Sequence, residues 1–174
     1  MDSKAMFSLS CGLYVVGTKV GDKLGGCIVD ALIQSTALPT TVLLCSICKN
    51  LTCDMIKESG LFSVSVLRKD VDPHVIANFG GISRRDWDKW GHVDGWIEKQ
   101  GLPVLPDVAA WMVCRVKSVH ELGTHTLFHA LVEDAEIGEG DPLTYGEYRA
   151  NIQKGTVPLF KAVRERAASE KKTL

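Results

Sequence analysis

The 174-residue chain is long enough for one domain with a full hydrophobic core, so it needs neither disulfides nor a metal to fold. Hydrophobic residues make up 45% and charged residues 24%, which argues against a disordered or fibrous protein. The formal net charge is -1, so the chain lacks the basic field that nucleic-acid binding requires, and we predict no nucleic-acid partner.

Membrane and disulfide signals are also weak. No apolar run reaches the length of about 18 residues that crosses a bilayer, so we expect a cytoplasmic protein with no membrane partner. Six cysteines in such a compartment should stay reduced and pack as small hydrophobes, and we predict no structural disulfide. Cys45, Cys48 and Cys53 have a spacing that resembles a metal or redox site. In an extended segment, however, residues three apart face opposite sides of the sheet, which favours a structural role.

Strand signals dominate the first part of the chain. Residues 6–18 are rich in apolar and aromatic side chains and predict a strand that ends in a tight turn at residues 20–23. A second strand is expected through residues 25–36 (GGCIVDALIQST). The continuous apolar run at residues 41–47 is too short for a typical helix and predicts a strand covered on both faces.

A short helix and another strand follow. Either Asn50 or Thr52 can cap a helix over residues 53–59, because a side-chain oxygen at that position accepts a bond from a free amide of the first turn. Gly60 is a natural end for this helix. Residues 61–67 (LFSVSVL) then predict a strand.

The second half of the chain begins with helical signals and ends with two long strands. A proline in the first turn predicts a helix over residues 73–80, and a further short helix is expected from Ser83. Residues 109–122 and 124–137 are long β-like stretches separated by Gly123, which predicts antiparallel neighbours.

These elements define the expected fold class: mainly β with α-helical insertions, as in a β-barrel, and not a parallel doubly wound sheet. We expect one domain over residues 1–160. Residues 161–174 hold five basic and two acidic residues and few large apolar groups, which predicts a basic C-terminal tail that is a surface helix or is frayed.

Common catalytic motifs are absent from the sequence. It contains no Gly-x-Gly-x-x-Gly after a strand, no phosphate-binding Gly-x-x-x-x-Gly-Lys loop and no Gly-x-Ser-x-Gly elbow. His125 and His129 share one face of a predicted strand, but further metal ligands are not evident nearby, and we predict no metal site.

One polar constellation could bind an anion. Residues 34–36 (Gln-Ser-Thr) lie between apolar strands, and residues 49–52 (Lys-Asn-Leu-Thr) lie at a predicted helix start. Hydroxyls, an amide, a lysine charge and free helix amides are the groups that a phosphate monoester needs. Ordinary helix capping beside a loop remains the alternative.

The segment from residue 25 to residue 67 resembles the flavin reductase-like FMN-binding family, in particular the branch with flavoredoxin and the flavin domain of high-molecular-weight rubredoxin. Further matches follow in order along the chain: GLYVV at 12–16, FG at 79–80, DKW at 88–90, GTHTLF at 123–128 and PLTY at 142–145. The resemblance implies an FMN-binding split β-barrel that forms a homodimer, with FMN as cofactor and NAD(P)H as a possible electron donor.

The resemblance also implies a set of cofactor contacts. In such proteins the strand ending in the Gln-Ser-Thr segment lies along the isoalloxazine ring, and the segment at the helix start holds the phosphate. The residues assigned to the cofactor in this way are Asp30, Ala31, Gln34, Ser35, Thr36, Lys49, Asn50, Thr52 and His125. No side chain is required as a catalytic acid or base, because the flavin performs the chemistry.

Asp30 departs from the pattern, because members of this branch commonly carry asparagine there. A carboxylate facing the flavin would disfavour the anionic reduced ring and lower its reduction potential. The alternative is that Asp30 points out of the barrel, since neighbours along a strand alternate faces.

Together these features favour an FMN-binding oxidoreductase, either an NAD(P)H-dependent flavin reductase or a protein that transfers electrons through its flavin to a partner protein. The alternatives are a non-enzymatic electron carrier of the flavoredoxin type and a split barrel that binds haem or another ligand. Residues 154–160 (KGTVPLF) resemble the linker to the iron-binding domain of rubredoxin-fused relatives. No Cys-x-x-Cys pair follows, so we expect any electron acceptor to be a separate protein.

Overall fold

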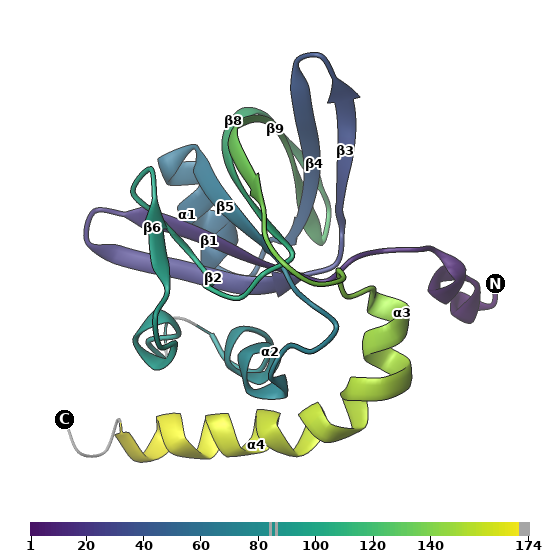
Figure 1. The fold of residues 1–174 in the computed structure, drawn as a ribbon, viewed down its shortest axis with the longest axis vertical. Coiled ribbons are helices and arrows are strands. Elements are labelled where there is room, and N and C mark those ends of the chain that lie inside the picture. The colour runs from purple at the N-terminus through teal and green to yellow at the C-terminus, as the bar shows by residue number, and fades with distance from the viewer. Residues whose placement is uncertain (84, 86, 171–174) are drawn as a thin grey trace.

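A computed structural model describes residues 1–83, 85 and 87–170, and its centre is a curled antiparallel sheet of seven strands (Figure 1). The strands run in the order β2-β1-β5-β8-β9-β4-β3, and a separate two-stranded sheet is formed by β6 and β7. The strands of the large sheet are β1 (Tyr14–Val20), β2 (Lys23–Val29), β3 (Leu32–Ala37), β4 (Thr40–Ile47), β5 (Leu61–Val66), β8 (Ala110–Leu122) and β9 (His125–Ile137), and those of the small one are β6 (Ile97–Lys99) and β7 (Leu102–Val104).

Helices connect and cover the strands. They are the 3-10 helix η1 (Ser3–Ser8), α1 (Leu51–Ser59), α2 (Pro73–Gly80), the 3-10 helix η2 (Trp90–His92), α3 (Tyr145–Glu147), the π-helix η3 (Tyr148–Ile152) and α4 (Gln153–Glu170). In Figure 1, α2 and α4 lie together on one side of the sheet, while no labelled helix lies over the β3–β4 hairpin. The mainly β fold class is confirmed.

The sheet is open between β2 and β3, which follow one another in the chain but form its two opposite edges. The prediction of one strand over residues 25–36 is therefore wrong. The backbone breaks at Asp30 and Ala31, where the Asp30 carbonyl accepts from the Leu32 amide (3.2 Å) and the Ala31 carbonyl accepts from the Cys45 amide (2.8 Å). This crossover curls the sheet, and the open edge makes the fold a split barrel.

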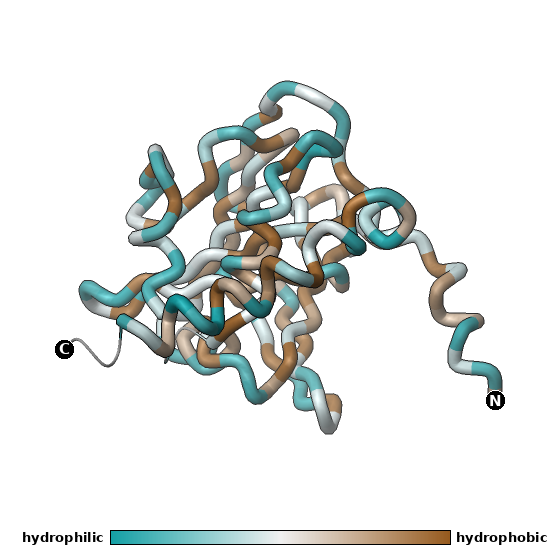
Figure 2. Tube along the Cα trace, turned by 90° about the horizontal axis from the view of Figure 1, so that it is seen from below, coloured by the Kyte–Doolittle hydropathy of each residue, from teal (hydrophilic) through white to brown (hydrophobic). Residues whose placement is uncertain are grey.

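The strand predicted over residues 6–18 is correct only for its second half. Residues 3–8 form η1, where the Asp2 side chain accepts from the Lys4 amide, and every residue of η1 is exposed. Figures 1 and 2 show this N-terminal segment extending away from the body, where no strand is available to pair with it. The apolar residues there raised the strand signal without a partner strand to satisfy it.

The other local predictions are largely confirmed. The turn after β1 contains Gly21 at φ +55°, Gly60 ends α1 at φ +68°, and Asp72 caps α2 by accepting from the His74 amide (2.9 Å). β8 and β9 pair as antiparallel neighbours. Asn50, and not Thr52, is the N-terminal cap residue of α1. The helix expected from Ser83 falls partly on residues 84 and 86, outside the described residues.

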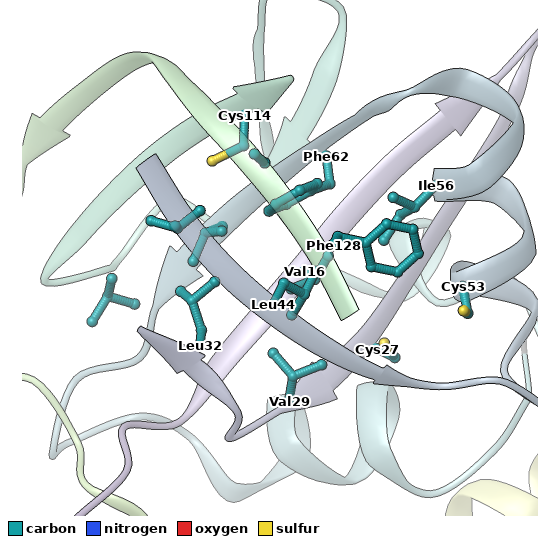
Figure 3. Close-up of a cluster of buried hydrophobic side chains, with 14 of the residues drawn as sticks. Val16, Cys27, Val29, Leu32, Leu44, Cys53, Ile56, Phe62, Cys114 and Phe128 are labelled. Carbon is teal, nitrogen blue, oxygen red and sulfur yellow. The ribbon is translucent and has the colours of Figure 1, made fainter. Parts of the chain in front are cut away.

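Two apolar cores stabilise this arrangement, one on each face of the sheet. Alternation along β1 sends Val16 into the barrel and Val15 to the outer core, and neither is exposed to solvent. Figure 3 shows the barrel core, in which Leu44, Phe62 and Phe128 meet side chains from α1. The outer core joins the sheet to α2 and to η2. α1 thus covers one part of the barrel interior, which fixes the position of its first turn.

Candidate functional site

The Gln-Ser-Thr segment lies on β3, an edge strand that pairs with β4 alone among the described strands, and all three side chains are exposed. A bulge between Gln34 and Thr36 inserts one residue, so two adjacent hydroxyls turn toward the same neighbour. The Thr41 hydroxyl lies 2.7 Å from Ser35 Oγ and 2.5 Å from Thr36 Oγ1. Gln34 Nε2 donates to the Thr36 carbonyl at 3.2 Å. β3 therefore presents a row of polar groups whose positions are fixed by hydrogen bonds to Thr41 on β4 and to the Thr36 carbonyl.

The start of α1 provides free donors. The Asn50 side chain makes no capping bond, and the backbone carbonyl of Asn50 accepts from the amides of Cys53 (2.9 Å) and Asp54 (3.4 Å). The amides of Leu51 and Thr52 have no hydrogen-bond partner within the described part of the chain. Unpaired amides and the positive end of the helix dipole make such a terminus favourable for an anion.

Thr52 and Asn50 also face the barrel interior. Thr52 is only 2% exposed. Burial raises the pKa of the Cys27 thiol, while the Lys89 ammonium and hydrogen bonds to the Thr52 and Asn50 side chains oppose this shift. The Thr52 hydroxyl therefore lies beside Cys27, and of the Thr52 donors only the backbone amide remains free at the helix start.

Arg85 is a candidate that the sequence did not single out. Its guanidinium donates to the Lys49 carbonyl (3.3 Å) and to Asp54 Oδ2 (3.1 Å), which places a cation beside the first turn of α1. The only sequence signal was a pair of arginines after the predicted helix at 73–80. The contact joins residues 31 or more apart, so no local pattern could have revealed it.

β4 links the predicted residues to one another. Thr36 pairs with Thr41 near the beginning of the strand, whereas Asn50 follows closely after its last residue, Ile47. Ile47 is six residue steps along the strand from Thr41, about 20 Å at 3.3 Å per residue. The hydroxyl groups of Ser35, Thr36 and Thr41 and the start of α1 thus form two groups of polar residues at opposite ends of β4.

The remaining candidates flank the later part of β4. Ala31 bonds to Cys45, and His125 pairs with Ile47, with its Nδ1 2.9 Å from Thr124 Oγ1. Asp30 is half-buried at the crossover beside Ala31. The structure therefore brings Ala31 and His125 close to the helix start and leaves the Gln-Ser-Thr segment at the far end of β4.

The cysteines behave as packing residues. All six are free thiols, and burial raises the pKa of Cys27, Cys53 and Cys114, that of Cys114 to about 12. Thiols with raised pKa values are poor nucleophiles and poor metal ligands.

Among the described residues, no group of three or more His, Cys, Asp or Glu side chains is arranged to hold a metal ion. No described helix combines the length and apolar character needed to cross a bilayer.

An open, curled antiparallel sheet with a polar edge strand and a helix start whose first amides are free defines the chain as a split-barrel protein. The model of the flavin reductase like domain matches residues 6–152. The high molecular weight rubredoxin of Moorella thermoacetica is 33% identical over 160 residues, which cover 91% of this chain and 69% of that protein. The ferric-chelate reductase (NAD(P)H) of Archaeoglobus fulgidus is 32% identical over 160 residues, covering 91% and 94%.

A solved structure gives the same result. The flavin reductase PheA2 superposes with a TM-score of 0.73 at 29% identity, covering 84% of this chain and 95% of that one. The chain belongs to the flavin reductase-like family. It is an oxidoreductase of the flavin reductase type that uses flavin and NAD(P)H. The family resemblance noted from the sequence is confirmed.

Proposed function

We propose that the flavin is FMN and that it lies along β4, with its ring beside β3 and its phosphate at the start of α1. The observation that carries this proposal is that two free amides, at Leu51 and Thr52, lie at a helix start beside which the Arg85 guanidinium is also held. A phosphate monoester carries a charge of about -1.5 to -2 and three acceptor oxygens, which fits this donor set. When bound, the flavin accepts a hydride and passes electrons onward.

The chain's own residues have three roles in this proposal. The amides at the start of α1 and Asn50 hydrogen-bond the phosphate, and Lys49 and Arg85 neutralise its charge. Gln34, with the two hydroxyl residues that follow it, donates to or accepts from the polar edge of the ring. Asp30, Ala31 and His125 lie beside the chain that joins ring and phosphate, and the Asp30 carboxylate lowers the reduction potential if it faces the ring.

We propose a homodimer on the basis of an apolar face that β3, β4, β8 and β9 leave uncovered. His125 lies between Ile47 and Leu122 in one row of cross-strand neighbours, and Ile33 pairs with Leu43 in another row of the same face. Ile33, Ile47 and Leu122 are 60%, 47% and 54% exposed. Large exposed apolar patches mark interaction sites. Sedimentation should give twice the mass of 19.0 kDa, and Ile47→Asp should give a monomer. A wild-type monomer with flavin bound would contradict the dimer.

We also propose that the reduced flavin or its electrons pass to a separate partner protein in the cytoplasm. Several relatives are named as reductase components of oxygenase systems, which supports this transfer. The flavoredoxin-type electron carrier is the second candidate, and the relative named as a rubredoxin favours it.

The test of the cofactor is an absorbance spectrum of the protein after reconstitution with FMN and desalting. We expect a yellow protein with flavin absorption, and FMN should bind more tightly than riboflavin, which has no phosphate. Equal affinity for FMN and riboflavin would remove the phosphate site from α1. A Soret band after haem addition, without flavin binding, would support the haem-binding alternative.

A further inference from the structure

A hollow of about 820 Å³ lies between α2, α4 and the loops that follow β5 and β7, and it is separate from the β3–β4 site. This volume is within the range of about 300–1,000 Å³ that small-molecule pockets occupy. None of the nine residues assigned to the flavin lines it. The flavin proposal therefore leaves this hollow without a role.

Half of the residues that line the hollow are apolar, and the other half are polar or charged. Leu67 and Leu105 form part of its buried side, Val71 and Val75 line it from the segment at the start of α2, and Val163 lines it from α4. The three valines are half-buried, so they present apolar surface to the hollow without being fully covered. A ligand with an apolar body would remove this surface from water.

The charges around the hollow are unbalanced. Four carboxylates line it, at Asp70, Asp72, Asp94 and Asp107, against the two guanidinium groups of Arg68 and Arg166. This leaves an excess of two negative charges when the lining histidines are neutral.

Two of these carboxylates already have hydrogen-bond partners within the protein. Arg68 donates to both oxygens of Asp70 (2.9 and 2.6 Å), and Asp72 accepts from the His74 amide as the cap of α2. Arg166 is itself engaged with Glu170 at 3.1 Å.

Asp94 and Asp107 differ from this pattern. In the described part of the chain, neither carboxylate forms an ion pair or a hydrogen bond, although Asp107, after the larger effect of Asp70, helps to raise the pKa of the Arg68 guanidinium. Both are exposed and lie at the boundary of a partly apolar hollow, so a cation there would gain charge pairing while its apolar part gained contact with the walls.

We propose that this hollow binds a small organic cation, an amine with an aliphatic or aromatic body. The ammonium group lies against Asp94 and Asp107, and the body contacts Val71, Val75 and Val163. Anions of the same size are repelled by the excess negative charge of the lining, and neutral analogues lose the charge contribution. The proposal is independent of the flavin site, so the failure of one leaves the other standing.

Calorimetric titration with hexylammonium, hexanol and hexanoate at low salt tests the charge preference. Hexylammonium should bind about two- to thirtyfold more tightly than hexanol, since two exposed charge pairs each contribute modestly, and hexanoate should give no saturable signal. The double variant Asp94→Asn/Asp107→Asn should reduce hexylammonium affinity to that of hexanol. Asp22→Asn, in the β1–β2 turn, is the matched control and should change nothing. Equal binding of all three probes, or of none, would overturn the proposal.

A second variant tests the location. Val163→Trp fills the hollow from α4 and should abolish hexylammonium binding, whereas Val157→Trp, at an exposed position of the same helix, should not. Circular dichroism checks that both variants retain the fold. If Val163→Trp folds and still binds hexylammonium with unchanged affinity, the cation binds elsewhere and the proposal fails.

Discussion

Replacement of Arg85 by glutamine removes the charge beside the first turn of α1 and keeps a hydrogen-bonding side chain of similar length. At a separation of about 5 Å and a dielectric of about 80, each pair of unit charges contributes ~0.8 kcal/mol. A phosphate monoester with a charge of about -1.5 to -2 therefore loses ~1.2–1.7 kcal/mol, roughly tenfold in affinity. The high dielectric is appropriate because the Arg85 side chain is 52% exposed.

The assay is fluorescence titration of the flavin-free protein with FMN and with riboflavin. Arg85→Gln should weaken FMN binding and leave riboflavin binding unchanged, and Asp54→Asn, which frees Arg85 from its ion pair, should strengthen FMN binding. Arg115→Gln is the matched control, because its guanidinium is also exposed and paired with a carboxylate, on β8. Equal losses for FMN and riboflavin, or no loss at all, would refute the phosphate role of Arg85.

Three further variants test other parts of the structure. Asp30→Asn should raise the flavin reduction potential, because the Coulomb contribution of a carboxylate about 8 Å away is ~2 kcal/mol at a dielectric of about 20. Spectroelectrochemistry measures the potential, and an unchanged or lower value means that Asp30 does not face the ring. Gly26→Ala should cost about 1–3 kcal/mol in thermal unfolding, since its Cβ would lie 2.9 Å from Trp90 Nε1, and an unchanged Tm would show that the outer core relaxes. The pKa of Glu147 is lowered to about 2, chiefly by the hydrogen bond from the Thr144 amide, so the stability that Glu147 contributes is present above about pH 4.5 and is lost as pH falls toward 2. In pH-dependent denaturation, Glu147→Gln should therefore lose less stability between about pH 4.5 and 2 than the wild type does, and an equal loss would contradict the assignment.

Local signals were sufficient for the elements whose ends are set by local chemistry. Gly60 stops α1 because it adopts a positive φ, and Asp72 caps α2 because its carboxylate reaches the next free amide. The two long strands β8 and β9 were predicted because a turn at Gly123, with φ +72°, joins two β-like segments. In each case the deciding contact lies within a few residues.

The sequence could not show features that depend on distant partners. The break at Asp30 and Ala31 lies between two segments that both favour a strand, and it exists because the sheet curls until β2 and β3 form opposite edges. Residues 6–8 were assigned to a strand, but they belong to the exposed helix η1 and pair with no described strand. Arg85 entered the candidate site through its contacts with the Lys49 carbonyl and with Asp54 on α1.

The candidate site itself was predicted in part. The helix start at Asn50 and the polar segment on β3 were identified from residue type, but the bulge that turns Ser35 and Thr36 toward Thr41 was not, since its position depends on pairing with β4. The side chain of Thr52 was assigned to phosphate, whereas the structure directs its hydroxyl to Cys27 and leaves its amide at the helix start. The role of Thr52 in phosphate binding stays a prediction.

Anaerobic stopped-flow mixing of the FMN-loaded protein with NADH or NADPH tests the central claim most directly. The account predicts that the flavin absorption bleaches with at least one of the two nucleotides, at a rate that saturates with nucleotide concentration, and that added FMN is reduced over many turnovers. Retention of FMN without bleaching by either nucleotide would contradict the reductase assignment and favour an electron carrier reduced by another protein.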